Sequence, residues 1–344
     1  IREELTSLGK FYFLPNRGNL GDVVIAAAEY QYFDSLNLEY EVFQQAPDEE
    51  FNLVYGGGGQ WVQYYDCSDI IDIFRNPKIK KIVILPSSIN QCDDLIKFMD
   101  ERFTVFCREE QSYNYCISQN SRAKFIQADD MAFGLNIDNI GTYNKLSEID
   151  GNDFVKVYTD LYENYKYVYN QIDKIKELTN IENDKRIGYF LRKDVESNNN
   201  WENCCFKHNL DISNLMGTYG LDKNFCYILS KLFLSIIDTV DIVVTDRLHV
   251  GICGYLLGKQ AILIDNSYGK ISGVYNYTMK KFDNVHYTTA DNLKNTVENI
   301  AQNSPISAKH NIKTVSDIIS FYNEYCSDKN YDLIEKIMWT RRDL

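Results

Sequence analysis

Short apolar runs alternate with longer apolar and amphipathic segments along most of the chain. Runs of four to eight β-branched or aromatic residues between polar loops are typical of buried strands, and the longer segments are typical of helices. This strand–loop–helix rhythm predicts an α/β fold built on parallel sheets. The expected strands cover residues 11–14, 52–55, 80–85, 104–107, 124–128, 186–191, 242–245 and 261–265.

The rhythm is interrupted between about residues 136 and 185, where the chain is polar and rich in Tyr, Asn, Asp and Lys. A chain of 344 residues is also longer than one hydrophobic core usually covers. We therefore expect two parallel sheets in two domains. The expected parts are an N-terminal domain over 1–135, a helical connector over 136–185, a C-terminal domain over 186–305, and C-terminal helices over 306–344 that pack back on the N-terminal domain.

The stretch 241–270 carries the clearest candidate chemistry. Arg247 and His249 stand where the strand 242–245 passes into an apolar helix, and Lys270 follows the next strand. Free backbone N–H groups and the positive end of the helix dipole favour an anion at such a junction. Arg offers a planar fork for phosphate or carboxylate, and His exchanges protons near neutral pH. The pattern predicts an anion site with acid–base capacity.

A purely structural role for each of these residues is the alternative. Arg247 could pair with Asp246 or Asp265, and His249 could be a hydrogen-bonded residue at the start of the helix. We would favour that interpretation for any one of them alone. Three such groups at two adjacent strand ends favour a functional site.

The first half of the chain carries two glycine-rich loops that could approach a ligand. One covers 15–22, between a strand and an apolar helix, and the other is the run Gly56–Gly59. Neither matches a nucleotide-binding fingerprint. The first loop could bind a phosphate or a nucleotide, or it could be only a tight turn between strand and helix, and the sequence favours neither interpretation. Ser87 and Ser88 follow the strand 80–85, where they could bind a sugar or cap the next helix.

Charge and cysteine content narrow the classes of function. The formal net charge of −13 argues against a general nucleic-acid binder, which needs a basic face. The nine Cys include no CxxC pair, so we expect free thiols in a reducing cytoplasm, and no metal site. No run approaches the ~18 apolar residues of a membrane-spanning helix.

Taken in order, these landmarks resemble the polysaccharide pyruvyl transferase family. The resemblance covers roughly residues 10–275, and the Asp-Arg-Leu-His sequence at 246–249 is its most specific part. Arg17, two residues before Asn19, departs from the family pattern of the first loop. The matching residues are Asn19 to Asp22, Gly56 to Gly59, Leu85 to Ser88, Phe106 to Glu109 with Ser112, Asp129 with Asp130, Arg192, Thr245 to Val250, and Asn266 to Lys270.

The resemblance implies two Rossmann-like domains that face each other across a cleft, as in glycosyltransferases of the B fold. It implies transfer of the enolpyruvyl unit of phosphoenolpyruvate onto two hydroxyls of one sugar, giving a cyclic pyruvate ketal and phosphate. Phosphoenolpyruvate is then a co-substrate, and no further cofactor is implied. The second domain would hold this donor through Arg192, Arg247, the backbone of Leu248, His249 and Lys270.

Within this set we expect His249, Arg247 and Arg192 to be catalytic, with His249 as the general acid or as an aid to phosphate departure. The acceptor's base is unassigned, and Asp22 and Asp129 are candidates that could equally cap a loop or a turn. The other candidates for acceptor binding or for shaping the loops are Asn19, Gly21, Gly57, Gly58, Ser87, Ser88 and Arg108.

The expected acceptor is a galactose or N-acetylhexosamine residue of a surface polysaccharide or of its lipid-linked precursor. We expect a cytoplasmic protein, and an undecaprenyl-diphosphate-linked acceptor would bring it to the inner face of the cytoplasmic membrane. Two other functions remain open. The first is a glycosyltransferase of the same architecture that uses a nucleotide sugar, and the second is a non-catalytic module that binds a sugar or an anion.

Overall fold

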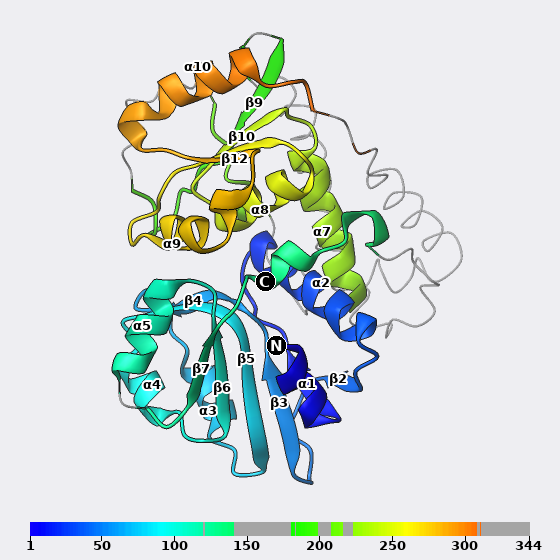
Figure 1. The fold of residues 1–344 in the computed structure, drawn as a ribbon. Helices are drawn as coiled ribbons and strands as arrows, with labels where there is room; N and C mark the ends of the chain where they lie inside the picture. The colour runs from blue at the N-terminus through cyan, green and yellow to red at the C-terminus, as the bar shows by residue number, and fades with distance from the viewer. Residues whose placement is uncertain are drawn as a thin grey trace, which may run out of the picture.

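The computed structural model describes residues 1–119, 121–140, 180–182, 184–198, 208–215, 223–307 and 310. These residues form two sheets, which Figure 1 shows at the two ends of the molecule with helices α2 (Leu20–Ser35) and α7 (Lys223–Ile237) between them. Most of the expected connector and nearly all of the expected C-terminal helices, residues 141–179 and 311–344, lie outside the described residues.

The first sheet has seven strands in the order β2-β1-β3-β5-β6-β7, with β4 paired to β5, and every pair is parallel. The five strands expected in this half are present. The sequence missed the short edge strand β2, and it missed β4, which begins inside the run of four glycines. The strands are β1 (Phe11–Leu14), β2 (Tyr40–Val42), β3 (Phe51–Tyr55), β4 (Gly58–Val62), β5 (Ile79–Asn90), β6 (Phe103–Cys107) and β7 (Lys124–Gln127).

The second sheet has five strands in the order β12-β11-β10-β9-β8. The expectation of a wholly parallel sheet is wrong at one edge, where β8 pairs with β9 in the antiparallel sense. So few residues separate these two strands that only antiparallel pairing can join them. The strands are β8 (Asn180–Glu182), β9 (Lys185–Tyr189), β10 (Ile242–Thr245), β11 (Gln260–Leu263) and β12 (Val285–Tyr287).

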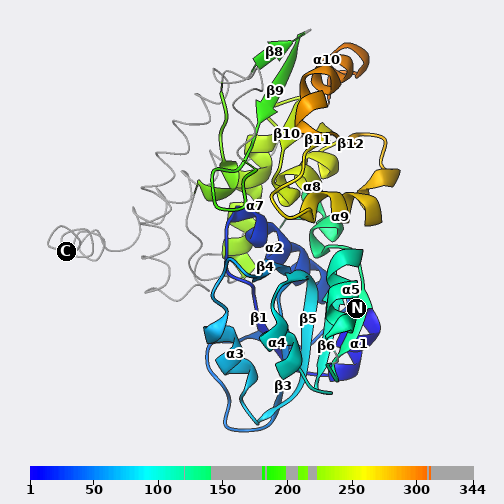
Figure 2. The same cartoon turned by 90° about the vertical axis from the view of Figure 1, so that its left-hand side faces the viewer.

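Helices cover both sheets (Figures 1 and 2). None of those in the described part of the chain is both long and apolar enough to cross a membrane. Besides α2 and α7, the α-helices are α1 (Arg2–Leu8), α3 (Ser68–Phe74), α4 (Asp93–Phe98), α5 (Glu110–Ser118), α8 (Leu248–Leu256), α9 (Lys270–Tyr277) and α10 (Leu293–Asn303). The 3-10 helices are η1 (Met131–Gly134), η2 (Ile137–Asn139), η5 (Ile212–Asn214), η6 (Met279–Lys281) and η7 (Ala290–Asn292).

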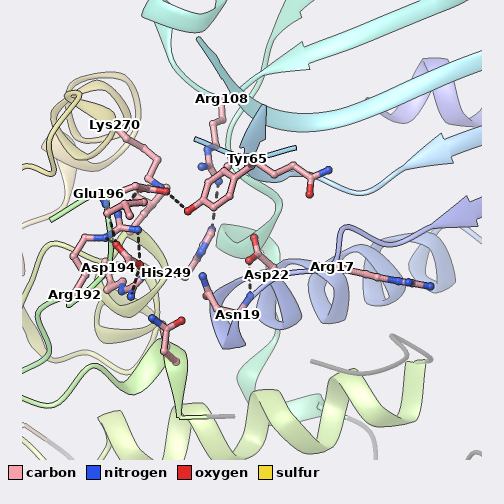
Figure 3. A pocket seen from close by; sticks show the side chains of 18 of the residues that line it. Arg17, Asn19, Asp22, Tyr65, Arg108, Arg192, Asp194, Glu196, His249 and Lys270 are labelled. Atoms are coloured by element: carbon pink, nitrogen blue, oxygen red, sulfur yellow. Dashed lines mark hydrogen bonds and ion pairs between the residues drawn. The ribbon is translucent and has the colours of Figure 1, made fainter. Parts of the chain in front are cut away.

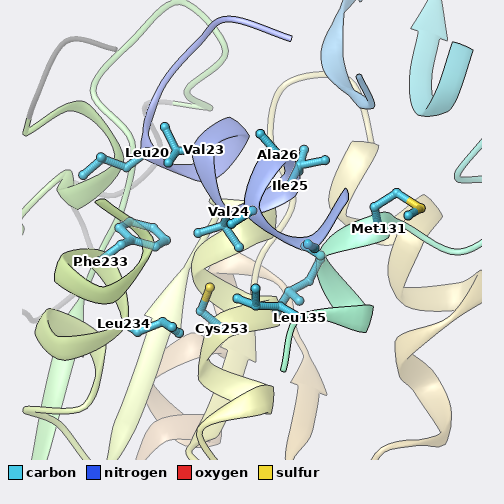
Figure 4. Close-up of a cluster of buried hydrophobic side chains, with 14 of the residues drawn as sticks. Leu20, Val23, Val24, Ile25, Ala26, Met131, Leu135, Phe233, Leu234 and Cys253 are labelled. Atoms are coloured by element: carbon cyan, nitrogen blue, oxygen red, sulfur yellow. The ribbon is translucent and has the colours of Figure 1, made fainter. Parts of the chain in front are cut away.

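Helix α2 ties the two halves together. Its first two turns are apolar on nearly every side, which is typical of a helix buried in a core. Leu20, Val23 and Val24 belong to the same buried cluster as Phe233 of α7 and Cys253 of α8 (Figure 4). Because this cluster draws on both halves of the chain, it fixes the start of α2 against the start of α8. Those two helix starts border the candidate site.

Candidate active site

A cavity of about 620 Å³ lies between the two halves of the molecule (Figure 3). The loop before α2 and strand β4 line it from the N-terminal half. The segment after β9 and the starts of α8 and α9 line it from the other half. Its charged lining residues are Arg17, Asp22, Asp66, Arg108, Arg192, Asp194, Glu196, Arg247, His249 and Lys270.

Two buried arginines of this cavity are already paired with carboxylates. Arg192 places Nε 2.7 Å from Asp194 Oδ1 and Nη1 2.5 Å from Glu196 Oε2. Arg247 places Nη2 2.8 Å from Asp194 Oδ2 and 2.5 Å from Asp211 Oδ2. The alternative considered from the sequence, a pairing of Arg247 with Asp246 or Asp265, is not the one that forms, although Arg247 does pair with carboxylates. The carboxylates orient both guanidinium groups and offset much of their charge.

Glu196 gathers polar groups from both halves of the molecule. Its Oε2 accepts from Lys270 Nζ at 3.1 Å, and its Oε1 accepts from the Tyr65 hydroxyl at 2.6 Å. Burial alone would raise the pKa of Glu196, but Lys270 and Arg192 hold that pKa well below its usual range. Glu196 is therefore an ionised, fixed anion, and it cannot serve as a base near neutral pH.

His249 lies against a buried ion pair of the N-terminal half. Its Nε2 is 3.3 Å from Asp130 Oδ2 and 3.4 Å from Arg108 Nη1, and Arg108 Nη1 donates to the same Asp130 oxygen at 2.7 Å. Burial would raise the pKa of Asp130, but His249 and Arg108 hold it far below its usual range. An ionised Asp130 favours a proton on Nε2 of His249, so it fixes the tautomer and the orientation of the ring.

Arg108 also supplies a free donor. Its side chain is fully buried, and its Nη2 has no hydrogen-bond partner among the described residues. Arg108 Nη2 and Lys270 Nζ lie 3.0 and 3.3 Å from the position that a Cβ on Gly59 would occupy, so they converge on one wall of the cavity. Helix α8 begins beside them with Leu248 and His249, and no side chain in the described part of the chain caps its start. Together these groups form a seat for an anion.

The loop before α2 combines a structural role with a place at the cavity. Asp22 Oδ2 accepts from the Asn19 N–H at 2.9 Å, and Asn19 Oδ1 accepts from the Gly21 N–H at 2.8 Å, which is a capping box. Asn19 and Asp22 both line the cavity. A Cβ on Gly21 would lie 2.6 Å from His249 Nδ1, so only glycine fits against the imidazole here.

The remaining candidates of the N-terminal half do not line the cavity. The Gly57 N–H donates to the buried carboxylate of Glu29 at 2.7 Å, and Gly58 has a backbone φ of 155° that favours glycine. Ser87 donates to the backbone carbonyl of Leu85. These contacts shape the glycine-rich loop and the end of β5.

Ser88 and Asp129 contact other side chains and do not line the cavity. Ser88 accepts from Arg108 Nε at 2.8 Å and so helps to orient that guanidinium. Asp129 accepts from the Thr278 hydroxyl at 2.6 Å and does not line the cavity. The neighbouring Asp130, which we did not select, is the carboxylate that reaches His249. Two identical residues follow the expected strand 124–128, so the sequence alone could not show which of Asp129 and Asp130 points toward the cavity.

The family model for polysaccharide pyruvyl transferases matches residues 19–268 of this chain. The chain belongs to the polysaccharide pyruvyl transferase family. The resemblance noted from the sequence is thus confirmed, and it supports transfer of a pyruvyl group onto a polysaccharide. All the residues that converge on the anion seat, apart from Lys270, fall within the matched range.

A crystal structure of a functionally uncharacterized protein from Klebsiella pneumoniae is similar to this pyruvyl transferase. The two chains share 25% sequence identity with a TM-score of 0.63, over 84% of this chain and 96% of the other. A search of curated proteins finds no match to the sequence.

In this pyruvyl transferase, Gly21→Ala should displace the His249 ring, because the added Cβ would lie 2.6 Å from Nδ1. A catalytic group misplaced by about 1 Å can cost up to about 10²-fold in rate, so we expect kcat to fall by 10- to 10²-fold. Alanine is a better helix former than glycine, so helix propensity gives no reason for the melting temperature to fall. Unchanged kcat would show that the ring has room to move.

Asp246 predicts a pH dependence of stability. Its Oδ1 accepts from the Arg192 N–H at 2.8 Å, its Oδ2 has no partner among the described residues, and burial raises the pKa to about 7. Between about pH 4, the pKa of an unfolded Asp, and about pH 7, the folded protein binds more protons than the unfolded chain. The free energy of unfolding should therefore fall as the pH rises through this window. Asp246→Asn keeps the acceptor oxygen and should remove this fall, which is about 4 kcal/mol at most. Urea unfolding at pH 5 and pH 8 measures the free energy of unfolding of the wild type and of Asp246→Asn. The same change between the two pH values in both proteins would contradict the prediction.

Proposed function

We propose that this protein transfers the enolpyruvyl unit of phosphoenolpyruvate onto two hydroxyls of one sugar and releases phosphate. The observation that carries the proposal is the buried Nη2 of Arg108, which no described residue pairs with, beside Lys270 Nζ and the start of α8, which no described side chain caps. A phosphate at this seat would complete the hydrogen bonds of Arg108. In a cleft shielded from water, such contacts stabilise an anion more than they would in bulk water.

The paired arginines suit the carboxylate of the same donor. A guanidinium has five N–H donors, so Arg192 and Arg247 can each keep a carboxylate partner and still offer hydrogens to the cavity. The expected donor set of Arg192, Arg247, the Leu248 backbone, His249 and Lys270 lines one cavity, and we add Arg108 to it.

The chemistry needs one proton delivered and two removed. The methylene carbon of the donor takes a proton and becomes a methyl group, while a sugar hydroxyl adds to the neighbouring carbon and loses its own proton. The bond from that carbon to the phosphate oxygen then breaks, and a second hydroxyl closes the ketal as its proton leaves. We assign the proton delivery, or assistance to phosphate departure, to His249.

The acceptor side of the proposal rests on the N-terminal half. Asp22 lines the cavity and is a candidate base for the sugar hydroxyl, whereas Asp129 is turned to Thr278. We propose a galactose or N-acetylhexosamine residue of a surface polysaccharide, or of its undecaprenyl-diphosphate-linked precursor, as acceptor. The protein would then work in the cytoplasm at the inner face of the membrane. The two sheets and the cavity between them support a two-domain arrangement like that of the B-fold glycosyltransferases.

Donor binding separates this function from a glycosyltransferase that uses a nucleotide sugar. Phosphoenolpyruvate at about 100 times its Kd should stabilise the protein by about 2.7 kcal/mol, and uridine or guanosine diphosphate should not raise the melting temperature. Stabilisation by a nucleotide alone would favour the glycosyltransferase.

Turnover separates an enzyme from a binding module. Phosphate release from phosphoenolpyruvate should require a sugar, and a panel of galactosides and N-acetylmannosaminides supplies candidate acceptors. Binding of phosphoenolpyruvate without phosphate release with any acceptor would favour the non-catalytic module.

A further inference from the structure

A second cavity, of about 550 Å³, adjoins the candidate active site and belongs wholly to the N-terminal half. The segment between β4 and α3 forms one wall, and the end of β5 with the start of α4 forms the other. Tyr65 and Asp66 line both cavities, so these two residues form the partition between them. The second cavity is lined by Val62, Gln63, Tyr65, Asp66, Cys67, Ser68, Ile71, Gln91, Cys92, Asp93, Asp94 and Leu95.

The two cavities differ in charge. The wall of the first combines four arginines and a lysine with four carboxylates, whereas the residues named for the second include no Lys, Arg or His. Three carboxylates, Asp66, Asp93 and Asp94, border the second cavity instead. A phosphate or a carboxylate placed there would face these like charges, and Lys97, whose Nζ lies 3.9 Å from Asp93 Oδ2, is not among the lining residues. The second cavity is therefore unsuited to the anionic donor.

The same wall suits a ligand with many hydroxyl groups. Carboxylates accept hydrogen bonds from hydroxyls, and the amides of Gln63 and Gln91 both donate and accept them. The half-buried Ile71 adds apolar surface against which the C–H face of a sugar ring can pack, whereas Val62 and Leu95 are only 2% and 4% exposed.

Part of the polar wall is held in place before any ligand arrives. Asp66 Oδ1 accepts from the Ser68 N–H at 2.9 Å, and Asp93 accepts a hydrogen bond from the Tyr115 hydroxyl. The partition is tied to the other half of the molecule, because the Tyr65 hydroxyl donates to Glu196 at 2.6 Å. A ligand that spans both cavities would therefore meet preformed contacts on each side of Tyr65.

We propose that the second cavity binds a neutral sugar residue of the acceptor, adjacent to the residue that takes the pyruvyl group. This inference rests on the proposed function and adds that the enzyme recognises at least two sugar residues. The acceptor would run past Tyr65 from the donor cavity into the second cavity. A disaccharide with the correct terminal sugar should then be a better acceptor than the terminal sugar alone.

The test compares simple p-nitrophenyl glycosides of galactose and N-acetylmannosamine with disaccharide glycosides that end in the same sugars. For the wild type, kcat/KM should be at least about 10-fold higher with the matching disaccharide, the effect of about one added hydrogen-bonded contact. Gln91→Gly should reduce this preference to near unity and leave the KM for phosphoenolpyruvate unchanged. Gln91 has a backbone φ of 54°, so glycine removes the amide without straining the turn.

Asp69→Ala is the matched control, because Asp69 is exposed on the neighbouring helix α3 and does not line the cavity. It should keep the wild-type preference for disaccharides. Equal kcat/KM for single sugars and disaccharides in the wild type would overturn the inference. A Gln91→Gly protein that keeps the full preference would overturn it as well.

Ligand-observed NMR with the same disaccharides measures binding without turnover, so it separates the two levels of the proposal. Disaccharide binding that Gln91→Gly abolishes, without phosphate release, would contradict the pyruvyl transfer proposed above and leave the sugar site standing. Failure of every disaccharide in the panel to bind the wild type would overturn the sugar site itself.

Discussion

His249→Gln should lower kcat for phosphate release by about 10²- to 10⁴-fold, the usual range for the loss of one acid–base group. Glutamine keeps a hydrogen-bonding side chain toward Asp130 and Arg108 but cannot deliver a proton. His249 retains only 11% of its side-chain exposure at the cavity edge, and it contributes little to the apolar core. The KM for phosphoenolpyruvate should therefore change much less than kcat. Steady-state phosphate release across pH measures both constants.

His286→Gln is the matched control for this substitution. His286 lies in β12, away from the cavity, and its Nε2 is 2.8 Å from Gln260 Oε1. The control should keep wild-type kcat, and circular dichroism should show that both variants are folded. Near-normal kcat in His249→Gln would mean that His249 only positions the donor and that the proton comes from another group or from water.

The fold was predictable where the sequence repeats a simple pattern. Runs such as 82–85, within the expected strand 80–85, and 242–245 are apolar because these parts of their strands are buried on both faces of a parallel sheet. Strands β2 and β8 have only three residues each, which is too few for a period to appear. Strand β4 begins with two glycines, whose weak strand preference concealed it.

The site was predictable only as far as it follows from strand ends. The positions of Arg247, His249 and Lys270 follow from the topology of β10 and β11. Their partners do not, because His249 meets Asp130 across 119 residues and Arg247 meets Asp211 across 36. Such contacts depend on how the two halves pack and how loops return, and one sequence carries no periodic trace of them.

Arg247→Ala should lower both stability and activity, and the two losses have separate causes. In the wild type, Arg247 Nη2 lies 2.5 Å from Asp211 Oδ2 and 2.8 Å from Asp194 Oδ2, and the substitution removes this cation from both carboxylates. Removing one partner of a buried ion pair costs about 3–5 kcal/mol in the free energy of unfolding. Loss of one charge-assisted contact to the donor should lower kcat/KM by roughly 10- to 150-fold. Urea unfolding and phosphate release measure the two effects, and Arg75→Ala, which breaks an exposed pair with Asp72, should change neither by much.

A double variant distinguishes the two roles of Arg247. In Arg247→Ala/Asp211→Asn a neutral amide replaces the buried carboxylate. Its oxygen can still accept from the Lys193 N–H, which in the wild type donates to Asp211 at 3.1 Å. Much of the lost stability should return, because the cost of the single variant comes largely from an uncompensated charge. Activity should stay low, since the guanidinium that faces the donor is still missing, and Arg247→Lys should restore little because an ammonium cannot reproduce the fork. Recovery of kcat/KM together with stability in the double variant would show that Arg247 only holds the fold of the cavity wall.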